Sequence, residues 1–333
     1  MPLLEIKNLS IYYKLQEGWV HAIENVNLNL EHGERLGLVG ESGCGKTTLA
    51  YSITFLLPNN AHLKNGTIKF EDRDLTAIAV KKDGRINMFA EGLRNIRWKE
   101  ISIIFQSAMN SFNPVMTIGE QIAEAIQTHE KIGREETQER IKALYDIVGI
   151  PKDRMDSFPH EYSGGMRQRS LIAMSIALNP KLIIADEPTT ALDVITQDKI
   201  LAELVKLQQS TNSSMIIISH DISIVAQLST RIAIMYAGEV VENAPTREIF
   251  KAPRHPYTMA LLRAFPSIRG EKKRLSTIPG SPPDLINPPK GCRFMPRCPF
   301  AKERCSTERP VLREVSSNHS AACHFTEEIF GGK

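Results

Sequence analysis

Apolar residues in the first 250 positions of the chain follow two patterns, short continuous runs and runs at helical spacing. The continuous runs are rich in Ile, Leu and Val, which is typical of parallel strands that are buried on both faces. Alternation of such strands with helical segments predicts an α/β architecture with a largely parallel sheet. The sequence predicts these strands at residues 35–39, 182–186, 215–219 and 232–236.

Two segments depart from this alternation. Residues 117–149 carry apolar side chains at intervals of three and four and show no strand-like pattern, which predicts a helical insertion beside the sheet. We place this helical subdomain at about residues 107–175. From Ala244 onward proline becomes dense, which predicts a second, loop-rich module. We therefore expect two domains, at residues 1–250 and 251–333.

Composition and charge narrow the class of protein. With 42% hydrophobic and 24% charged residues, the chain has the composition of a globular protein, which excludes a disordered or fibrous one. The net charge of +3 is too small to predict a nucleic-acid partner. No run approaches the ~18 apolar residues of a membrane-spanning helix, and Glu5 interrupts the N-terminal segment before a signal peptide can form. We expect a cytoplasmic protein.

Residues 40–47 read Gly-Glu-Ser-Gly-Cys-Gly-Lys-Thr and match the eight-position pattern of a phosphate-binding P-loop. The loop follows a predicted strand and precedes a helix-compatible segment, so its backbone N–H groups and the helix dipole can face phosphate oxygens. We expect Lys46 to contact the β- and γ-phosphates of ATP and Thr47 to bind Mg²⁺. The predicted nucleotide-binding residues of this segment are Gly40, Ser42, Gly43, Cys44, Gly45, Lys46, Thr47 and Thr48.

Two adjacent carboxylates end the predicted strand at residues 182–186. Ligands of open α/β sheets bind at the carboxyl ends of the strands, so Asp186 is placed to reach the Mg²⁺ ion. The side chain of Glu187 is expected to point the opposite way from that of Asp186 and so to polarise an attacking water molecule. Together with the P-loop, these acids predict an ATPase.

Residues 162–169 read Tyr-Ser-Gly-Gly-Met-Arg-Gln-Arg. A Ser-Gly-Gly turn that opens a helix is a second anion-binding arrangement in a chain with one P-loop. At this point the sequence resembles the ATP-binding subunits of ABC transporters, because the octapeptide is similar to the signature motif of that family. The resemblance implies that Ser163, Gly164 and Gly165 contact ATP held by the P-loop of a second subunit. Met166 departs from the commonest form of the motif, which has Gln.

Four further residues fall where the family has functional positions. The resemblance implies that Gln106 is the Q-loop residue, acting in catalysis and at the Mg²⁺ ion, and that Asp193 belongs to the D-loop, which contributes to nucleotide binding. It also implies that His220, which follows a predicted strand, is the catalytic switch histidine. An aromatic residue of the family stacks on adenine, and we assign this role to Tyr13, with Trp19 and a purely structural tyrosine as alternatives.

Residues 254–262 and the proline-rich loops after them resemble the C-terminal extension of oligopeptide and dipeptide importer ATPases. The gaps between the cysteines of this extension are wide and lack the tight Cys-x₂₋₄-Cys pairs of most zinc sites, which favours a structural [4Fe–4S] cluster. Zn²⁺, with His319 or His324 as a substitute ligand, and unliganded cysteines stay open as alternatives, and solvent-facing histidines are the simpler expectation. The candidate cluster ligands are Cys292, Cys298, Cys305 and Cys323.

The fold class expected is therefore an α/β P-loop ABC ATPase domain with a helical subdomain and a small, irregular, metal-binding C-terminal extension. The resemblance implies ATP hydrolysis that drives di- or oligopeptide import at the cytoplasmic face of the membrane. It implies two transmembrane permease subunits, a second ATPase subunit that is identical or related, and indirectly an extracellular solute-binding protein. Oligosaccharide or nickel import is the first alternative. A non-transport ABC ATPase is a second, disfavoured because the chain has no long coiled coil and no tandem ATPase domain.

Overall fold

The computed structural model describes residues 1–105, 111–188, 194–264 and 278–331. The chain divides into two compact units. The first unit consists of Met1–Leu30, Arg35–Met88 and Ile218–Lys333, and the second of Glu31–Glu34 and Phe89–Ile217. Across these described stretches, no helix is both long enough and apolar enough to span a membrane.

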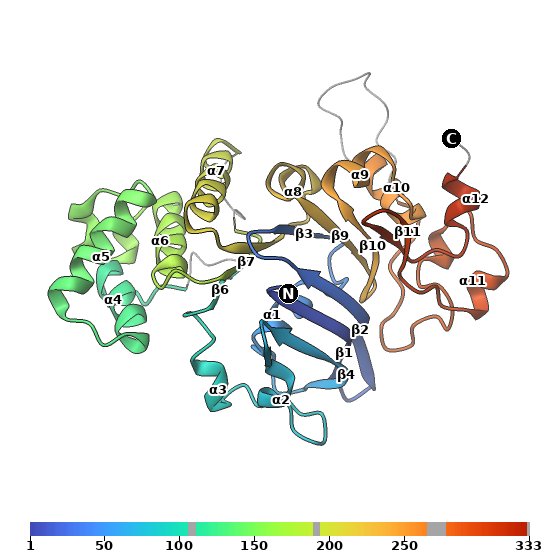
Figure 1. The fold of residues 1–333 in the computed structure, drawn as a ribbon, viewed down its shortest axis with the longest axis horizontal. Helices are drawn as coiled ribbons and strands as arrows, with labels where there is room; N and C mark the ends of the chain where they lie inside the picture. Colours follow the sequence, from blue (N-terminus) through green and yellow to red (C-terminus); the bar gives the residue numbers. More distant parts are fainter. Residues whose placement is uncertain (106–110, 189–193, 265–277, 332–333) are drawn as a thin grey trace. The chain divides into compact units, whose positions relative to one another are not determined.

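The first unit begins with an antiparallel sheet in the strand order β2-β1-β4-β5, of which Figure 1 labels the first three strands. The last residues of β2 alternate strictly, with Val26, Leu28 and Leu30 buried and the asparagines between them exposed. That period of two gives the sheet one apolar face and one solvated face. Its strands are β1 (Leu4–Lys14), β2 (Trp19–Leu30), β4 (Ala61–Phe70) and β5 (Arg73–Asp74), and α2 (Leu75–Ala79) follows them.

A second set of strands in this unit carries the nucleotide loop. The strand order is β11-β12-β10-β9-β3, with β3 parallel to β9 and the remaining pairs antiparallel. The strands are β3 (Arg35–Val39), β9 (Arg231–Tyr236), β10 (Glu239–Pro245), β11 (Arg313–Ser316) and β12 (His319–Ala321). Besides α2, the described part of this unit contains the helices α1 (Lys46–Ile53), α8 (Ile222–Leu228), α9 (Thr246–Lys251), α10 (Pro256–Ala264), the 3₁₀ helix η4 (Met295–Arg297), α11 (Arg304–Thr307) and α12 (Thr326–Phe330).

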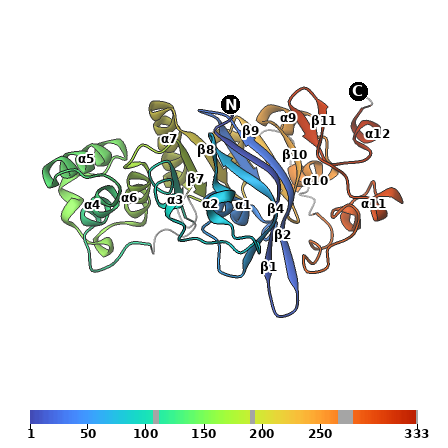
Figure 2. The same ribbon diagram turned by 60° about the horizontal axis from the view of Figure 1, so that its bottom comes forward.

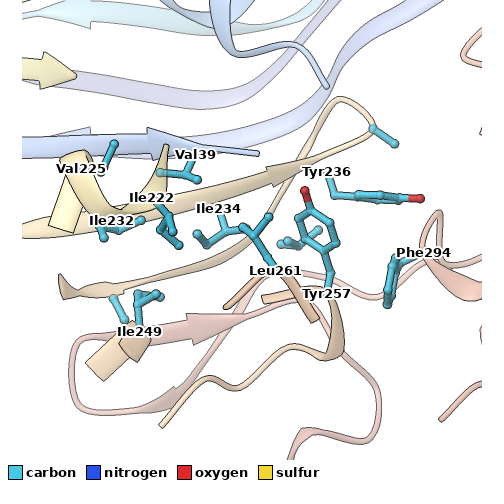
Figure 3. Packing of buried hydrophobic residues seen from close by; sticks show 13 residues of the cluster. Val39, Ile222, Val225, Ile232, Ile234, Tyr236, Ile249, Tyr257, Leu261 and Phe294 are labelled. Carbon is cyan, nitrogen blue, oxygen red and sulfur yellow. The ribbon is translucent and has the colours of Figure 1, made fainter. Parts of the chain in front are cut away.

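The C-terminal extension shares its hydrophobic core with this second set of strands (Figure 3). Tyr236 of β9, Tyr257 of α10 and Phe294 form an aromatic cluster with ring centroids 4.6–5.4 Å apart. All three side chains are almost fully buried. Aromatic burial of this kind is a large hydrophobic contribution, so residues beyond 251 pack into the first unit.

The second unit contains parallel strands and the predicted helical insertion (Figure 2). Strand β7 lies between β6, to which it is parallel, and β8. The capping box of Thr117 and Glu120 begins α4, and Ile118, Ile122 and Ile126 form its buried face. The elements are α3 (Glu91–Arg94), β6 (Ile101–Ile104), α4 (Ile118–His129), α5 (Arg134–Ile147), the 3₁₀ helices η2 (Lys152–Asp156) and η3 (Pro159–Glu161), α6 (Gly164–Ile176), β7 (Leu182–Asp186), α7 (Val194–Thr211) and β8 (Ser214–Ile218).

Candidate functional site

The P-loop connects β3 to α1, as the sequence predicts. Two glycines fix its path. At Gly40 a Cβ atom would lie 2.2 Å from the carbonyl oxygen of Met235, so no larger residue fits there. Gly45 has φ +103°, a conformation that L side chains rarely adopt, and it begins α1. The chain therefore reverses tightly at the N-terminus of a helix, which is the backbone arrangement that binds phosphate.

Lys46 lies at the centre of this loop. Its side chain is buried, and Nζ donates hydrogen bonds to the carbonyl oxygens of Gly40 at 2.8 Å and Glu41 at 3.0 Å. An ammonium group carries three donors and its charge favours anions, so this position suits a polyphosphate. Cys44 of the same loop is also buried, and burial raises the pKa of its thiol.

Tyr13 of β1 contacts the first turn of α1. Its hydroxyl lies 3.1 Å from Oγ1 of Thr48, and burial raises its pKa. Tyr12 instead stacks on His21 with ring centroids 4.0 Å apart and donates to the Glu24 carboxylate. Trp19 lies under the ammonium of Lys64, 3.4 Å from the ring centroid. Of the aromatic candidates, Tyr13 is the one held beside the P-loop helix, and its role toward adenine stays a prediction.

The predicted switch histidine lies in the same unit as the P-loop. His220 is exposed and precedes α8, whose first residues are capped by Asp221 through a 2.8 Å bond from the Ser223 N–H. The remaining two loop residues expected from the family, Gln106 and Asp193, lie outside the described residues.

In the second unit, β7 ends in the two predicted carboxylates. Asp186 is buried, whereas Glu187 is half-buried and has φ +48°. A non-glycine residue in the left-handed region costs on the order of 1–3 kcal/mol and is concentrated at functional sites. The positive φ of Glu187 therefore marks a sharp turn directly after the strand.

The Ser-Gly-Gly turn opens helix α6. The Ser163 hydroxyl caps the helix by accepting a hydrogen bond from the Met166 N–H at 3.3 Å, and Ser163 is exposed. The preceding residue, Tyr162, is buried, and its hydroxyl lies 3.0 Å from that of Tyr145 in α5. Gly164 and Gly165 form the first turn of α6, so the structure presents the motif at a helix N-terminus, the geometry that binds anions.

All four cysteines of the C-terminal extension line one apolar cavity of the first unit. Burial raises the pKa of Cys292 to about 12 and of Cys298 to about 11, and it also raises the pKa of Cys323. No set of three or more Cys, His, Asp or Glu side chains in the described stretches is grouped as a metal site. Thiols are the usual protein ligands of iron–sulfur clusters. These four thiols line one cavity, but they are not grouped as the ligands of a metal site would be.

The two histidines that flank Cys323 are engaged elsewhere. His319 is buried, and its Nε2 lies 2.7 Å from Oε1 of Glu242 in β10. His324 pairs with the carbonyl oxygen of Glu308 at 3.0 Å. The expectation that both histidines face solvent is therefore wrong for His319, because strand β12 pairs with β10 and carries this ring to a buried carboxylate.

Sequence reasoning missed the residues that join the extension to the nucleotide loop. Arg297 donates to both carboxylate oxygens of Glu41, at 2.7 and 2.9 Å, and the Tyr257 hydroxyl accepts the Glu41 N–H at 3.0 Å. The extension that carries the four cysteines and the nucleotide loop, predicted as parts of two domains, contact each other within one compact unit. No local pattern marks a pair so distant in sequence.

Comparison with known families identifies both parts of the chain. Residues 23–190 match the family model described as ABC transporter. Residues 241–305 match the model described as the oligopeptide/dipeptide transporter C-terminal region.

Two curated relatives are similar over nearly the whole chain. The oligopeptide transport ATP-binding protein OppD of Bacillus subtilis (strain 168) is 46% identical over 321 residues, which cover 95% of this chain and 87% of the relative. The dipeptide transport ATP-binding protein DppD of Escherichia coli (strain K12) is 40% identical over 327 residues, which cover 98% and 97%.

Solved structures agree on the fold. The ATP-binding cassette MJ0796, in a dimeric post-hydrolysis state bound to ADP and Pi, matches with a TM-score of 0.62 and 28% identity, covering 73% of this chain and 99% of that one. CbiO1 of Clostridium perfringens, part of the ABC transporter complex cbiONQ, matches with a TM-score of 0.62 and 26% identity, covering 75% and 90%. The family models, the curated relatives and the solved structures agree with the P-loop found between β3 and α1. The chain belongs to the ATP-binding subunits of oligopeptide/dipeptide ABC transporters.

Proposed function

We propose that this chain hydrolyses ATP to drive the import of di- or oligopeptides through partner permease subunits. The main support for this proposal is that one chain contains both a complete P-loop and a C-terminal region of the oligopeptide/dipeptide transporter type. The names of the similar proteins OppD and DppD support peptides as the cargo class. Membership of the family makes the chain an ATPase coupled to transport.

We assign nucleotide binding to the P-loop and its neighbours. Lys46 neutralises phosphate charge, and the backbone N–H groups of the loop donate to phosphate oxygens. Thr47, Asp186 and Gln106 would hold Mg²⁺, which screens the charge of the transferred phosphoryl group when bound. Tyr13 would stack on adenine. The buried Lys46 ammonium and the left-handed Gly45 support this assignment.

We assign the general base of hydrolysis to Glu187. A carboxylate that orients and deprotonates an attacking water is the usual contribution of such a residue, and its strained backbone turn fits a functional position. His220 would take part in hydrolysis as the switch histidine. Asp193 would contribute to the closed nucleotide site.

We propose that the complete site forms between two ATPase subunits. Each chain has one P-loop and one Ser-Gly-Gly turn at a helix N-terminus, where Ser163 is exposed. Its P-loop would hold one ATP, and Ser163, Gly164 and Gly165 would bind the ATP held by the P-loop of the partner. The second subunit is an identical or related chain. The ATPase subunits would sit at the cytoplasmic face of the membrane. Two transmembrane permease subunits would convert their closure and reopening into transport, with an extracellular binding protein delivering the peptide.

We propose that the four cysteines Cys292, Cys298, Cys305 and Cys323 hold a structural [4Fe–4S] cluster, with Zn²⁺ as the alternative metal. The four thiols line one cavity, and they would have to draw closer together to ligate a cluster, which would pin the loops of the extension. Because burial raises the pKa of three of these thiols, ligation requires them to lose protons as the metal binds.

Uptake by cells tests the cargo directly. A strain that lacks this chain is complemented with the wild-type chain or with Glu187→Gln, and uptake of labelled dipeptide, pentapeptide, oligosaccharide and nickel is measured in parallel. The proposal predicts that peptide uptake alone returns, and only with the wild-type chain. Return of oligosaccharide or nickel uptake without peptide uptake would contradict it.

A further inference from the structure

Glu41, the second residue of the P-loop, is held from two directions by the C-terminal extension. Its backbone N–H donates to the Tyr257 hydroxyl of α10 at 3.0 Å. Its two carboxylate oxygens accept hydrogen bonds from the guanidinium of Arg297 in η4, at 2.7 and 2.9 Å. Both the main chain and the side chain of this loop residue are therefore fixed by residues beyond position 251.

The guanidinium of Arg297 is itself rigidly placed. Its side chain is 4% exposed, Nε donates to the carbonyl oxygen of Pro279 at 2.8 Å, and one terminal nitrogen donates to the Tyr236 hydroxyl at 3.3 Å. Hydrogen bonding to Glu41 raises the pKa of Arg297, so the group stays charged at any physiological pH. A bidentate arginine–carboxylate pair in this setting is strong and geometrically specific.

Glu41 also belongs to the cradle of Lys46. The Glu41 carbonyl oxygen accepts a hydrogen bond from Lys46 Nζ at 3.0 Å. The main chain of one residue, Glu41, thus links the extension to the lysine of the P-loop. In addition, the Glu41 carboxylate brings a negative charge to a loop that binds polyphosphate, and a like charge there opposes binding unless a cation offsets it.

We propose that Arg297 and Tyr257 are positioning residues for the nucleotide, and that Arg297 neutralises Glu41 so that the P-loop accepts the phosphates of ATP. The C-terminal extension is then part of the ATP site as well as a neighbouring module. This inference rests on the proposed role of the P-loop in ATP binding.

A cycle of substitutions in the full-length chain separates charge neutralisation from simple structural support. ATP affinity in the presence of Mg²⁺ is measured by calorimetry for the wild type, Arg297→Gln, Glu41→Gln and the double variant. Arg297→Gln is expected to weaken binding ~10-fold, since it leaves the Glu41 carboxylate without its counter-charge. Glu41→Gln is expected to bind ATP within about twofold of wild type, and adding Arg297→Gln to it is expected to change little more.

Two controls make the outcome unambiguous. Arg313 forms an equally bidentate pair with Glu327, at 2.8 and 3.0 Å, in an exposed part of the same extension, so Arg313→Gln is expected to leave ATP affinity unchanged. Lys46→Ala tests the P-loop itself. If Lys46→Ala binds ATP normally, the proposed function of the loop fails.

Three results would contradict the proposed role of Arg297 even if the P-loop binds ATP. If Lys46→Ala loses affinity while Arg297→Gln keeps it, Arg297 does not position the nucleotide. If Arg297→Gln weakens binding equally in the wild-type chain and in the Glu41→Gln chain, Arg297 acts only as structural support and the neutralisation of Glu41 is refuted. The melting temperature of each nucleotide-free variant is recorded alongside, and an Arg297→Gln effect that merely follows a lower melting temperature also overturns the proposal.

Discussion

The ring of His255 accepts the backbone N–H of Tyr257 through Nδ1 at 3.0 Å, which makes a buried histidine the cap of α10. The ring also contacts the backbone of Ala322, and burial lowers its pKa from 6.5 to about 3. Because Nδ1 must stay unprotonated to accept this hydrogen bond, the native protein holds the neutral ring. Tyr257 in turn carries the hydroxyl that contacts Glu41.

This arrangement predicts acid-sensitive stability. Between pH 6.5 and about 3 the unfolded chain binds a proton at His255 that the native chain excludes, so the free energy of unfolding falls as the pH falls. We expect a slope from this group of ~1 kcal/mol per pH unit in urea titrations between pH 6 and 4. His255→Asn keeps a capping oxygen without the titration and is expected to flatten the slope. His160→Asn, at an exposed histidine, is the control and is expected to leave it unchanged. Equal slopes for wild type and His255→Asn would contradict the account.

Strand positions were predictable from the sequence where burial is complete on both faces. Strands β3 and β7 have the predicted bounds, and β8 and β9 begin one residue earlier than predicted. The antiparallel sheet of β1, β2 and β4 was missed, because register irregularities within β1 interrupt its alternation of apolar and polar residues.

Polar pairs between residues distant in sequence could not be predicted, for a different reason. Arg297 and Glu41 are 256 positions apart, and His319 reaches Glu242 only because β12 pairs with β10. Each partner alone has the sequence context of a surface residue, and only the pairing of distant segments buries Arg297, His319 and Glu242. The loops and strand ends of the nucleotide site, in contrast, follow local motifs whose backbone geometry the glycines dictate.

Substitution of the proposed general base is expected to separate hydrolysis from binding. Glu187→Gln keeps the size and polarity of the side chain but removes the proton acceptor, so single-turnover hydrolysis is expected to fall at least ~100-fold. ATP affinity is expected to change less than about twofold, since the phosphate contacts are made by the P-loop. Rapid-quench hydrolysis and equilibrium binding on the same preparation measure both. Hydrolysis at the wild-type rate would assign the base to another residue.

The signature residues are expected to act on the ATP of a partner subunit. Lys46→Ala disables the P-loop, and Gly165→Asp places a carboxylate at the helix N-terminus that would face the partner's phosphates. In a homodimer each variant alone is expected to be inactive, while an equal mixture recovers about a quarter of wild-type ATPase activity through mixed dimers with one competent site. Full activity of the Gly165→Asp chain alone would exclude this role.

The cysteine cavity makes a spectroscopic prediction. Anaerobically purified protein is expected to be brown, to absorb broadly near ~400 nm and to contain about four iron atoms per chain. Colourless protein with one zinc per chain would support the tetrahedral alternative.

The contact between the extension and the P-loop predicts that single cysteine substitutions weaken ATP binding to different extents. Cys298 directly follows Arg297, so Cys298→Ser is expected to weaken ATP binding by disturbing the Glu41 contact. Cys323→Ser, on the loop before α12, is expected to loosen the extension with a smaller effect on ATP affinity. Equal ATP affinity in the two variants, measured by calorimetry, would contradict this ordering.

The proposed function couples ATP hydrolysis by this chain to peptide import. Its most direct test measures ATP hydrolysis and the movement of a labelled oligopeptide in the same proteoliposomes, which contain the chain, its permease subunits and second ATPase subunit, and the peptide-loaded binding protein. We predict peptide movement in step with hydrolysis for the wild type, and neither process with Glu187→Gln. Peptide movement that persists with Glu187→Gln, or hydrolysis that continues without any movement of peptide, would contradict the account.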